Sequence, residues 1–175
     1  MVKKEYFLWG LGGFATVSVL GTFLHFLYEL SGGKLWSAVV SGVNESTWEH
    51  MKLLFFPMLF YAVAEYFFFG SRRDFWSIQL KSILLGQILI PVLFYTYNGV
   101  IGKSPDWVNI SIFFIAAFFA YRNQVKTLKK ENAAYFSPAF SLTTILVMAL
   151  LFGIFTFFPP KLELFLDPVN GTRGI

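Results

Sequence analysis

The chain contains no cysteine and only two histidines among its 175 residues. The absence of cysteine excludes disulfides, thiolate nucleophiles, iron–sulfur clusters and zinc sites with thiolate ligands. Charged residues are also scarce, at 14% of the chain against about 25% in an ordinary soluble domain. The sequence has no basic stripe with interleaved aromatic residues on a polar face, so nucleic acid is not an expected partner.

Apolar residues dominate instead. They make up 56% of the chain, and the aromatic share is 21%, with 23 phenylalanines. A water-soluble domain of this size cannot bury so many large apolar side chains, which therefore predict a lipid-facing surface. We predict an all-α, polytopic membrane helix bundle that forms one domain over residues 1–175, with the lipid bilayer around it. The number of copies in an assembly stays open.

Five segments approach the length of about 20 apolar residues that a membrane-spanning helix needs. The predicted spans are about 6–30, 51–69, 75–97, 105–123 and 135–158. The fourth is the weakest, because only residues 107–121 lack charge, and it lengthens if Arg122 and Lys126 extend to the membrane surface. The apolar centre of residues 31–48 is too short to cross, which predicts an interfacial or re-entrant segment. Residues 159–175 form a tail that either folds back over the outer face or stays unstructured.

Lysine and arginine are distributed unevenly between the two sides of this five-span scheme. One side carries eight such cations and three acids: Lys3, Lys4, Arg72, Arg73, Arg122, Lys126, Lys129, Lys130, Glu5, Asp74 and Glu131. The other side carries five cations and six acids: Lys34, Lys52, Lys103, Lys161, Arg173, Glu29, Glu45, Glu49, Asp106, Glu163 and Asp167. Because cytoplasmic loops are enriched in lysine and arginine, the N-terminus is predicted to be cytoplasmic and the C-terminus outside.

Both histidines fall on the outer side in this topology. His25 and Glu29 are one turn apart in the first span and so share a helical face, while His50 opens the second span. Polar residues of the first four spans and the tail converge on this side, which predicts an outer-face polar cavity. Its predicted core is His25, Glu29, Glu45, Glu49 and His50, and its predicted surroundings are Asn44, Asn98, Asp106 and Asp167.

Two imidazoles with nearby carboxylates suit a divalent metal such as zinc, and they also suit acid–base chemistry on a bound ligand. In the metal hypothesis His25, His50 and Glu29 hold the ion, and Glu49, with Glu45 beside it, is the candidate catalytic base. The coherent enzyme is a metal-assisted hydrolase or transferase that acts on a lipid-linked substrate. No HExxH, HxxxD or serine-elbow pattern is present, so enzymatic activity and the cofactor both stay open.

Other interpretations remain beside this one. Ser46 and Glu49 match the capping-box pattern, which explains these two residues without any ligand. The protein is alternatively a transport or solute-binding subunit whose second and third spans, kinked at Pro57 and Pro91, move. A third alternative is a structural or partner-binding membrane protein without catalysis.

Glu65 and Lys81 are the ionisable residues inside the second and third predicted spans. They lie at similar distances on either side of the SRRD turn, so their depths match in an antiparallel hairpin. Ionisable side chains within spans are usually paired. We predict a structural ion pair between Glu65 and Lys81, with a proton or ion relay as the alternative.

Three stretches, HFLYELSGG, VNESTWEHMKLLFFP and LFLDPVNGTRGI, together resemble a family of small multi-spanning bacterial membrane proteins of unknown function. The resemblance covers the whole chain, and its most specific parts are the NES-x-WEH-x-K block and the DP-x-x-GT-x-GI terminus. Arg173 departs from the pattern, which usually has an aromatic residue at this position. The resemblance implies a multi-pass protein of the bacterial plasma membrane, and it implies no activity.

Overall fold

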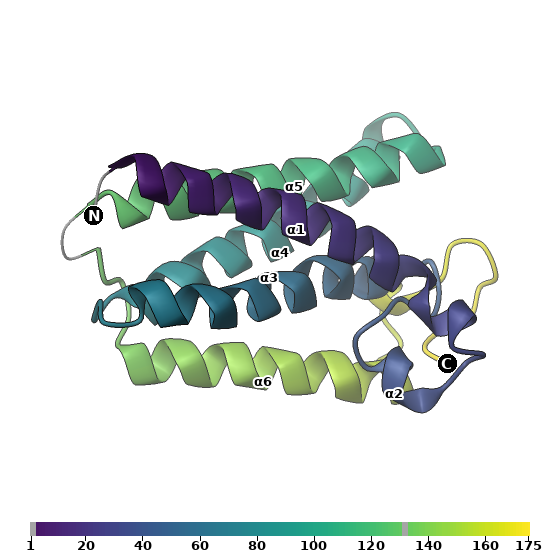
Figure 1. The fold of residues 1–175 in the computed structure, drawn as a ribbon. Coiled ribbons are helices and arrows are strands. Elements are labelled where there is room, and N and C mark those ends of the chain that lie inside the picture. Colours follow the sequence, from purple (N-terminus) through teal and green to yellow (C-terminus); the bar gives the residue numbers. More distant parts are fainter. Residues whose placement is uncertain (1–2, 131–132) are drawn as a thin grey trace.

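The computed structural model describes residues 3–130 and 133–175, which form a bundle of long helices (Figure 1). Glu131 and the side chain of Lys3, both used in the charge count above, lie outside what is described. The elements are α1 (Lys3–Leu30), α2 (Leu35–Ala38), α3 (Thr47–Phe69), α4 (Phe75–Val100), α5 (Asp106–Leu128), α6 (Pro138–Phe157) and the short 3-10 helix η1 (Glu163–Phe165). The described part of the chain has no strand, only one isolated bridge between Leu166 and Arg173, so the all-α prediction is confirmed.

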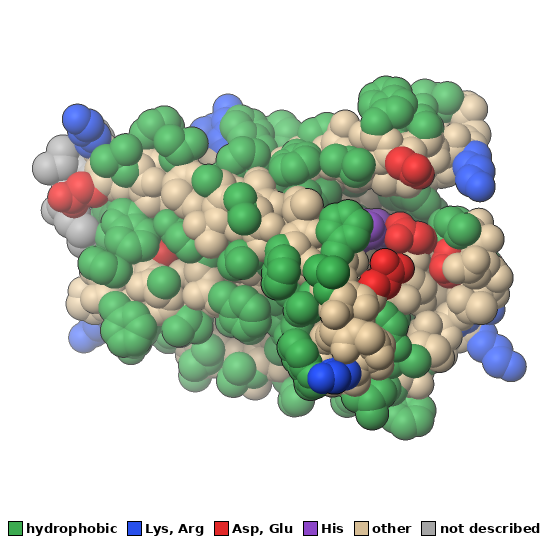
Figure 2. All heavy atoms as spheres, turned by 45° about the vertical axis from the view of Figure 1, so that its right-hand side comes forward, with side chains coloured by type: hydrophobic (Ala, Val, Ile, Leu, Met, Phe, Trp, Pro, Cys, Tyr) green, Lys and Arg blue, Asp and Glu red, His purple; other side chains and the backbone are tan. Residues whose placement is uncertain are grey.

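Four of these helices, α1, α3, α4 and α6, are long and apolar enough to cross a membrane, as judged over the described residues. Hydrophobic side chains cover most of the length of the bundle, and charged side chains gather toward its two ends (Figure 2). Helix α5 is not among the four, although its 23 residues extend for about 35 Å. The membrane character is thus supported by four helices, while the fifth span and the orientation stay predictions.

Local sequence signals explain where the helices begin and end. Ser46 has extended backbone angles, and its hydroxyl accepts a hydrogen bond from the amide of Glu49 at 3.4 Å, which confirms the predicted cap of α3. Ser137 caps α6 in the same way. Helix α1 ends before Gly32 and Gly33, whose φ angles of 74° and 72° are conformations that glycine adopts without steric cost.

Helices α3 and α4 occupy the centre of the bundle. Helix α1 packs on α3 and α5, and α4 packs on α3, α5 and α6, so α1 and α6 lie on different sides (Figure 1). Two of these contacts depend on glycine. A Cβ atom at Gly21 would lie 2.7 Å from the carbonyl oxygen of Leu53, and one at Gly86 would lie 2.8 Å from a methyl carbon of Leu54. Small residues therefore allow α1 and α4 to approach α3 closely, as they do in membrane helix pairs.

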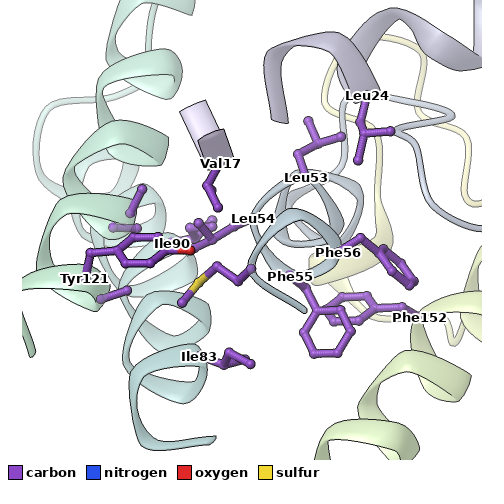
Figure 3. Packing of buried hydrophobic residues seen from close by; sticks show 14 of the residues in the cluster. Val17, Leu24, Leu53, Leu54, Phe55, Phe56, Ile83, Ile90, Tyr121 and Phe152 are labelled. Atoms are coloured by element: carbon purple, nitrogen blue, oxygen red, sulfur yellow. The ribbon is translucent and has the colours of Figure 1, made fainter. Parts of the chain in front are cut away.

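The main hydrophobic core draws on α1, α3, α4, α5 and α6 (Figure 3). The ring centroids of Phe55 on α3 and Phe152 on α6 are 4.9 Å apart. Leu54 and Ile83 are completely buried between α3 and α4. This packing fixes the long helices as one unit, so the loops at each end have defined positions.

The two ends of the bundle are held by different interactions. The tail end is where residues 159–175 lie. The Arg72 end is the opposite one, where the Arg72 guanidinium donates to Asp74 at 2.9 and 2.8 Å and to the Tyr6 hydroxyl at 3.2 Å. It also donates to the carbonyl oxygens of Leu128 and Lys130, each at 2.9 Å. One side chain thereby joins α1, the α3–α4 turn and the end of α5.

The Arg72–Asp74 contact also determines how this end responds to acid. Hydrogen bonds from Arg72 hold the pKa of Asp74 below its ordinary value, and the same bonds raise the pKa of Arg72. A carboxyl group whose pKa is depressed in the folded state stabilises the fold above its unfolded pKa of about 3.9. That contribution is lost as the pH falls through the folded-state value.

We expect Asp74→Asn to lower the free energy of unfolding by about 2 kcal/mol at neutral pH, because it removes charge-assisted hydrogen bonds to Arg72. The variant should also lose less additional stability than wild type as the pH falls below about 4. Thermal unfolding in detergent at several pH values measures both effects. Arg73→Gln, a change at an exposed neighbour, is the matched control. Equal acid sensitivity in wild type and Asp74→Asn would contradict the assignment.

Candidate functional site

A cavity of about 490 Å³ opens at the tail end of the bundle, bordered by α1, α4 and α5. Its polar lining consists of Thr22, His25, Glu45, His50, Asn98, Lys103, Ser104, Asp106 and Asn109. Its aromatic lining consists of Phe26, Phe94, Phe113 and Phe114. Figure 2 shows histidine and acidic side chains close together near this end. A cavity with both apolar walls and a few convergent polar groups is typical of a ligand-binding site.

The two histidines face the same carboxylate. The Nε2 atom of His25 lies 3.7 Å from one oxygen of Glu45, and the Nε2 atom of His50 lies 3.5 Å from the other. The ring centroids of the histidines are 5.7 Å apart. Glu45 belongs to the loop before α3, so this loop places an acid between groups from the end of α1 and the start of α3. We call these three residues the His–Glu–His cluster.

The hydrogen bond on the far side of the His50 ring determines its neutral tautomer. Its Nδ1 atom lies 3.0 Å from the carbonyl oxygen of Ser46. A carbonyl oxygen only accepts, so Nδ1 carries the proton and Nε2 of the neutral ring is an acceptor that faces Glu45. Two acceptors facing each other at 3.5 Å repel unless one of them is protonated or a donor lies between them.

The opposite wall of the cavity is organised by Asn98. Its side-chain oxygen accepts from the amide of Ser104 at 2.9 Å, and its NH2 group donates to the carbonyl oxygen of Phe94 at 2.8 Å. The Ser104 hydroxyl in turn donates to the side-chain oxygen of Asn109 at 2.8 Å. These bonds use the oxygen of Asn109, so its NH2 group is left as a donor at the cavity wall. Lys103 adds a cation there.

Glu49, one turn from Glu45, has a different environment. Both Glu49 and Lys52 are almost completely buried, and their charged groups are 2.6 Å apart. The second Glu49 oxygen accepts from the hydroxyl of Thr156 on α6 at 3.1 Å. Glu49 also accepts from the amide of Val43 at 3.1 Å, and Lys52 donates to the carbonyl oxygen of Ala38 at 2.7 Å. These contacts attach the loop that carries Glu45 to α3 and α6.

The structure brings together five of the predicted site residues: His25, Glu45, His50, Asn98 and Asp106 all line the cavity. Glu29 is exposed and does not line it, and Glu49 is buried in its ion pair. The predicted metal set of His25, His50 and Glu29 is therefore not assembled. Over the described residues, no group of three His, Cys, Asp or Glu side chains is arranged to hold a metal ion. The predicted base, Glu49, is likewise not available to a ligand.

Asn44 and Asp167 hold the tail instead of lining the cavity. The Asn44 NH2 group donates to the carbonyl oxygen of Gly174 at 2.9 Å. The Asn44 oxygen accepts from the amide of Ser46 at 2.9 Å, which is the bond that the capping-box pattern assigned to Glu49. The completely buried Asp167 accepts from the amides of Val169 and Asn170 at 2.7 and 3.3 Å.

Aromatic packing holds the same tail against the bundle. The ring of Trp48 at the start of α3 lies 4.5 Å from that of Phe152 on α6 and 4.8 Å from that of Phe165 in η1, measured between centroids. As a result the tail folds back across the end of α3 and places Pro168 and Val169 at the cavity. The tail is thus part of the wall of the site.

The predicted ion pair between Glu65 and Lys81 is not formed. Glu65 accepts hydrogen bonds from the NH2 groups of Gln79 and Gln124, at 2.8 and 2.6 Å. The ammonium group of Lys81 lies 3.7 Å from the ring centroid of Tyr135, as a cation–π contact. The side chains of the two residues therefore face different neighbours.

Comparison with known proteins adds one assignment. The sequence profile of the family of unknown function DUF6512 matches residues 2–175. The chain belongs to this family. A search of the curated proteins and a search of the solved structures found no match to it. Membership agrees with the resemblance to an uncharacterised family, and it assigns no reaction or ligand, so any function must be argued from the site itself.

Sequence reasoning missed several residues that matter in this family member. Lys103 and Ser104 lie in a GKSPD turn that reads only as a connection between helices. The Glu49–Lys52 pair was visible as an i,i+3 spacing of opposite charges, which is a recognised helix contact. Gln79 and Gln124 were visible as polar residues within apolar helices. The Glu49–Lys52 spacing and the two glutamines are therefore visible in the sequence, whereas pairing by opposite charge alone predicts Lys81 as the partner of Glu65.

The Glu49–Lys52 pair provides a sharp test of how the site is supported. We expect Lys52→Met to lower the free energy of unfolding by about 3–5 kcal/mol, because it leaves the Glu49 charge buried and uncompensated. The double variant Glu49→Leu/Lys52→Met should recover much of that loss, since it removes both charges. Thermal unfolding in detergent measures the cycle, with the exposed Lys103→Met as control. The coupling is contradicted if the double variant loses about as much free energy of unfolding again, relative to Lys52→Met, as Lys52→Met loses relative to wild type.

Proposed function

We propose that this protein is an integral membrane protein that binds a small amphiphilic ligand in the cavity at the tail end. The observation that carries the proposal is the His–Glu–His cluster: both histidines of the chain face one carboxylate at the wall of a cavity of about 490 Å³. Capping explains Ser46, and the buried ion pair explains Glu49. Neither explains why His25, Glu45 and His50 meet at the cavity.

The mixed lining supports an amphiphilic ligand. Phe26 of α1 and Ile110 and Phe114 of α5 line the cavity and are also exposed. In a bilayer, exposed aromatic and aliphatic side chains on these helices face lipid. The cavity is then reachable from the membrane between α1 and α5. An apolar part of the ligand fits this route, and its polar group reaches the cluster.

The distribution of cations supports an outer location for the cavity, in the orientation predicted from the sequence. The Arg72 end carries Lys4, Arg72, Arg73, Lys126, Lys129 and Lys130. The positive-inside rule assigns such an end to the cytoplasm. We propose that the tail end faces the outside of a bacterial plasma membrane and that α5 is the fifth span.

The chemistry available to the site is acid–base chemistry and hydrogen bonding. Glu45 accepts a proton or a ligand donor, and each imidazole can exchange a proton with it. Lys103 and the NH2 group of Asn109 offer donors on the opposite wall. The site is thus suited to a ligand with both acceptor and donor groups. Should the protein catalyse a reaction such as hydrolysis of a lipid-linked substrate, Glu45 is the candidate base, because Glu49 is buried in its ion pair.

Filling the cavity tests whether it binds a ligand. We expect Thr22→Trp to abolish retention of a membrane-derived amphiphile, because the indole occupies the space beside His25. Native mass spectrometry of protein released directly from membranes detects the bound mass. Val19→Trp adds the same side chain to an exposed position of α1 that does not line the cavity, so it should keep the ligand. Identical ligand content in wild type and Thr22→Trp would refute binding at this site.

A second experiment tests the cluster itself. Glu45→Gln removes the charge between the histidines and should lower the affinity for the amphiphile by tenfold or more. A lost hydrogen bond to a charged group costs about 1.5–3 kcal/mol, which corresponds to this range. Glu29→Gln changes an exposed acid that lies off the cavity and should leave binding unchanged. Displacement of the bound amphiphile by a dye-labelled phospholipid, followed by fluorescence, compares the affinities. If Glu29→Gln lowers the affinity more than Glu45→Gln does, the proposed role of Glu45 in recognition is contradicted.

A further inference from the structure

A second buried acid lies well inside the bundle, apart from the cavity. Glu65 on α3 meets Gln79 of α4 and Gln124 of α5, and the exposed fractions of the three residues are 1%, 2% and 1%. Each comes from a different helix, so the contact is formed only when the three helices are packed. None of the three lines the cavity at the tail end.

Glu65 has no cationic partner among the described residues. The salt bridges among the described residues involve Glu45, Glu49 and Asp74, and none involves Glu65. Lys81, the cation of similar depth, contacts Tyr135. An ionised carboxylate buried without an opposite charge is strongly unfavourable, and two amide hydrogen bonds do not replace its hydration.

The hydrogen bonds distinguish the two oxygens of Glu65. Oε2 accepts from the NH2 groups of both Gln79 and Gln124. Within the part of the chain that the structure describes, Oε1 is buried and accepts from no donor, and the side-chain oxygen of Gln124 is also buried without a partner. A carboxylate would leave half of its charge unsatisfied on Oε1. A carboxylic acid with its proton on Oε1 has a donor there instead, and Gln124 offers an oxygen acceptor on a side chain already bonded to Oε2.

The orientation of the amides argues against a metal cation in this place. Both glutamines present their NH2 groups to Glu65, whereas a bound cation would draw their oxygens. Among the described residues, the titratable side chains close enough to interact electrostatically with Glu65 include those of Tyr61 and Tyr121. Phenols are neutral near pH 7, so they add no counter-charge.

We infer that Glu65 is a proton-binding site within the membrane bundle: it carries an exchangeable proton on Oε1 at neutral pH, held by the Gln79–Gln124 amide pair. This inference is independent of the proposed cavity ligand. It also gives the amide pair a role, because the two donors on Oε2 fix the acid in one orientation and leave Oε1 for the proton.

Infrared spectroscopy of the purified protein in lipid nanodiscs at neutral pH tests the inference. Wild type should show the C=O stretching band of a protonated carboxylic acid, and the band should shift when water is exchanged for heavy water. Glu65→Gln should lose this band, and Glu29→Gln, a change at an exposed acid, should keep it. Absence of the band in wild type, or its persistence in Glu65→Gln, overturns the inference.

Two further measurements keep the test decisive if Glu65→Gln does not fold. Gln79→Leu removes one donor from Oε2 of an otherwise intact acid, so the band should move to higher frequency; an unchanged frequency assigns the band to another group. Sodium salts should leave the wild-type band unaltered. Its loss on adding sodium would show that a cation occupies the site and would overturn the assignment to a proton.

Discussion

At the start of α3, Glu49 and Lys52 are both removed from solvent, and their charges are compensated at 2.6 Å. Neither residue could be buried alone, because an isolated charge in an apolar bundle is far too costly. Their remaining hydrogen bonds reach Thr156 on α6 and the backbone of Ala38 and Val43. The position of the loop before α3 follows from this pair, and with it the position of Glu45 between the two histidines.

Three glutamates show how environment separates the roles of one side-chain type. Glu49 has a cation beside it and serves to hold helices and loop together. Among the described residues, Glu65 accepts hydrogen bonds from amides alone, which do not supply the opposite charge that an ionised carboxylate needs. Glu45 is exposed at a cavity and faces two imidazoles. The sequence positions of the three do not reveal this difference, because each lies beside or within an apolar helix.

The helical fold and much of the cavity could be predicted from the sequence. Long apolar segments give the helices, and connectivity places His25, Glu45, His50, Asn98 and Asp106 at one end. Depth along a helix follows from residue counting, but rotation about the helix axis depends on packing, and this is why Glu65 and Lys81 do not meet. Glu49 was misplaced for the same reason, because its contacts with Lys52, Thr156 and Val43 turn it away from the cavity, and Glu29 lies on an exposed face of α1. Helix α5 was the hardest to classify because polar and charged residues occupy both of its ends.

The bond between Lys52 and Thr156 joins residues that are 104 positions apart. The chain is synthesised from its N-terminus, so Glu49 and Lys52 are made well before Thr156. Because Glu49 and Lys52 lie within one turn of the same helix, their charges can compensate each other before Thr156 is made. Helix α6 then adds the hydrogen bonds of Thr156 to the pair. The tail adds Pro168 and Val169 to the wall of the cavity. The wall of the cavity is therefore complete only after the C-terminal residues have been made.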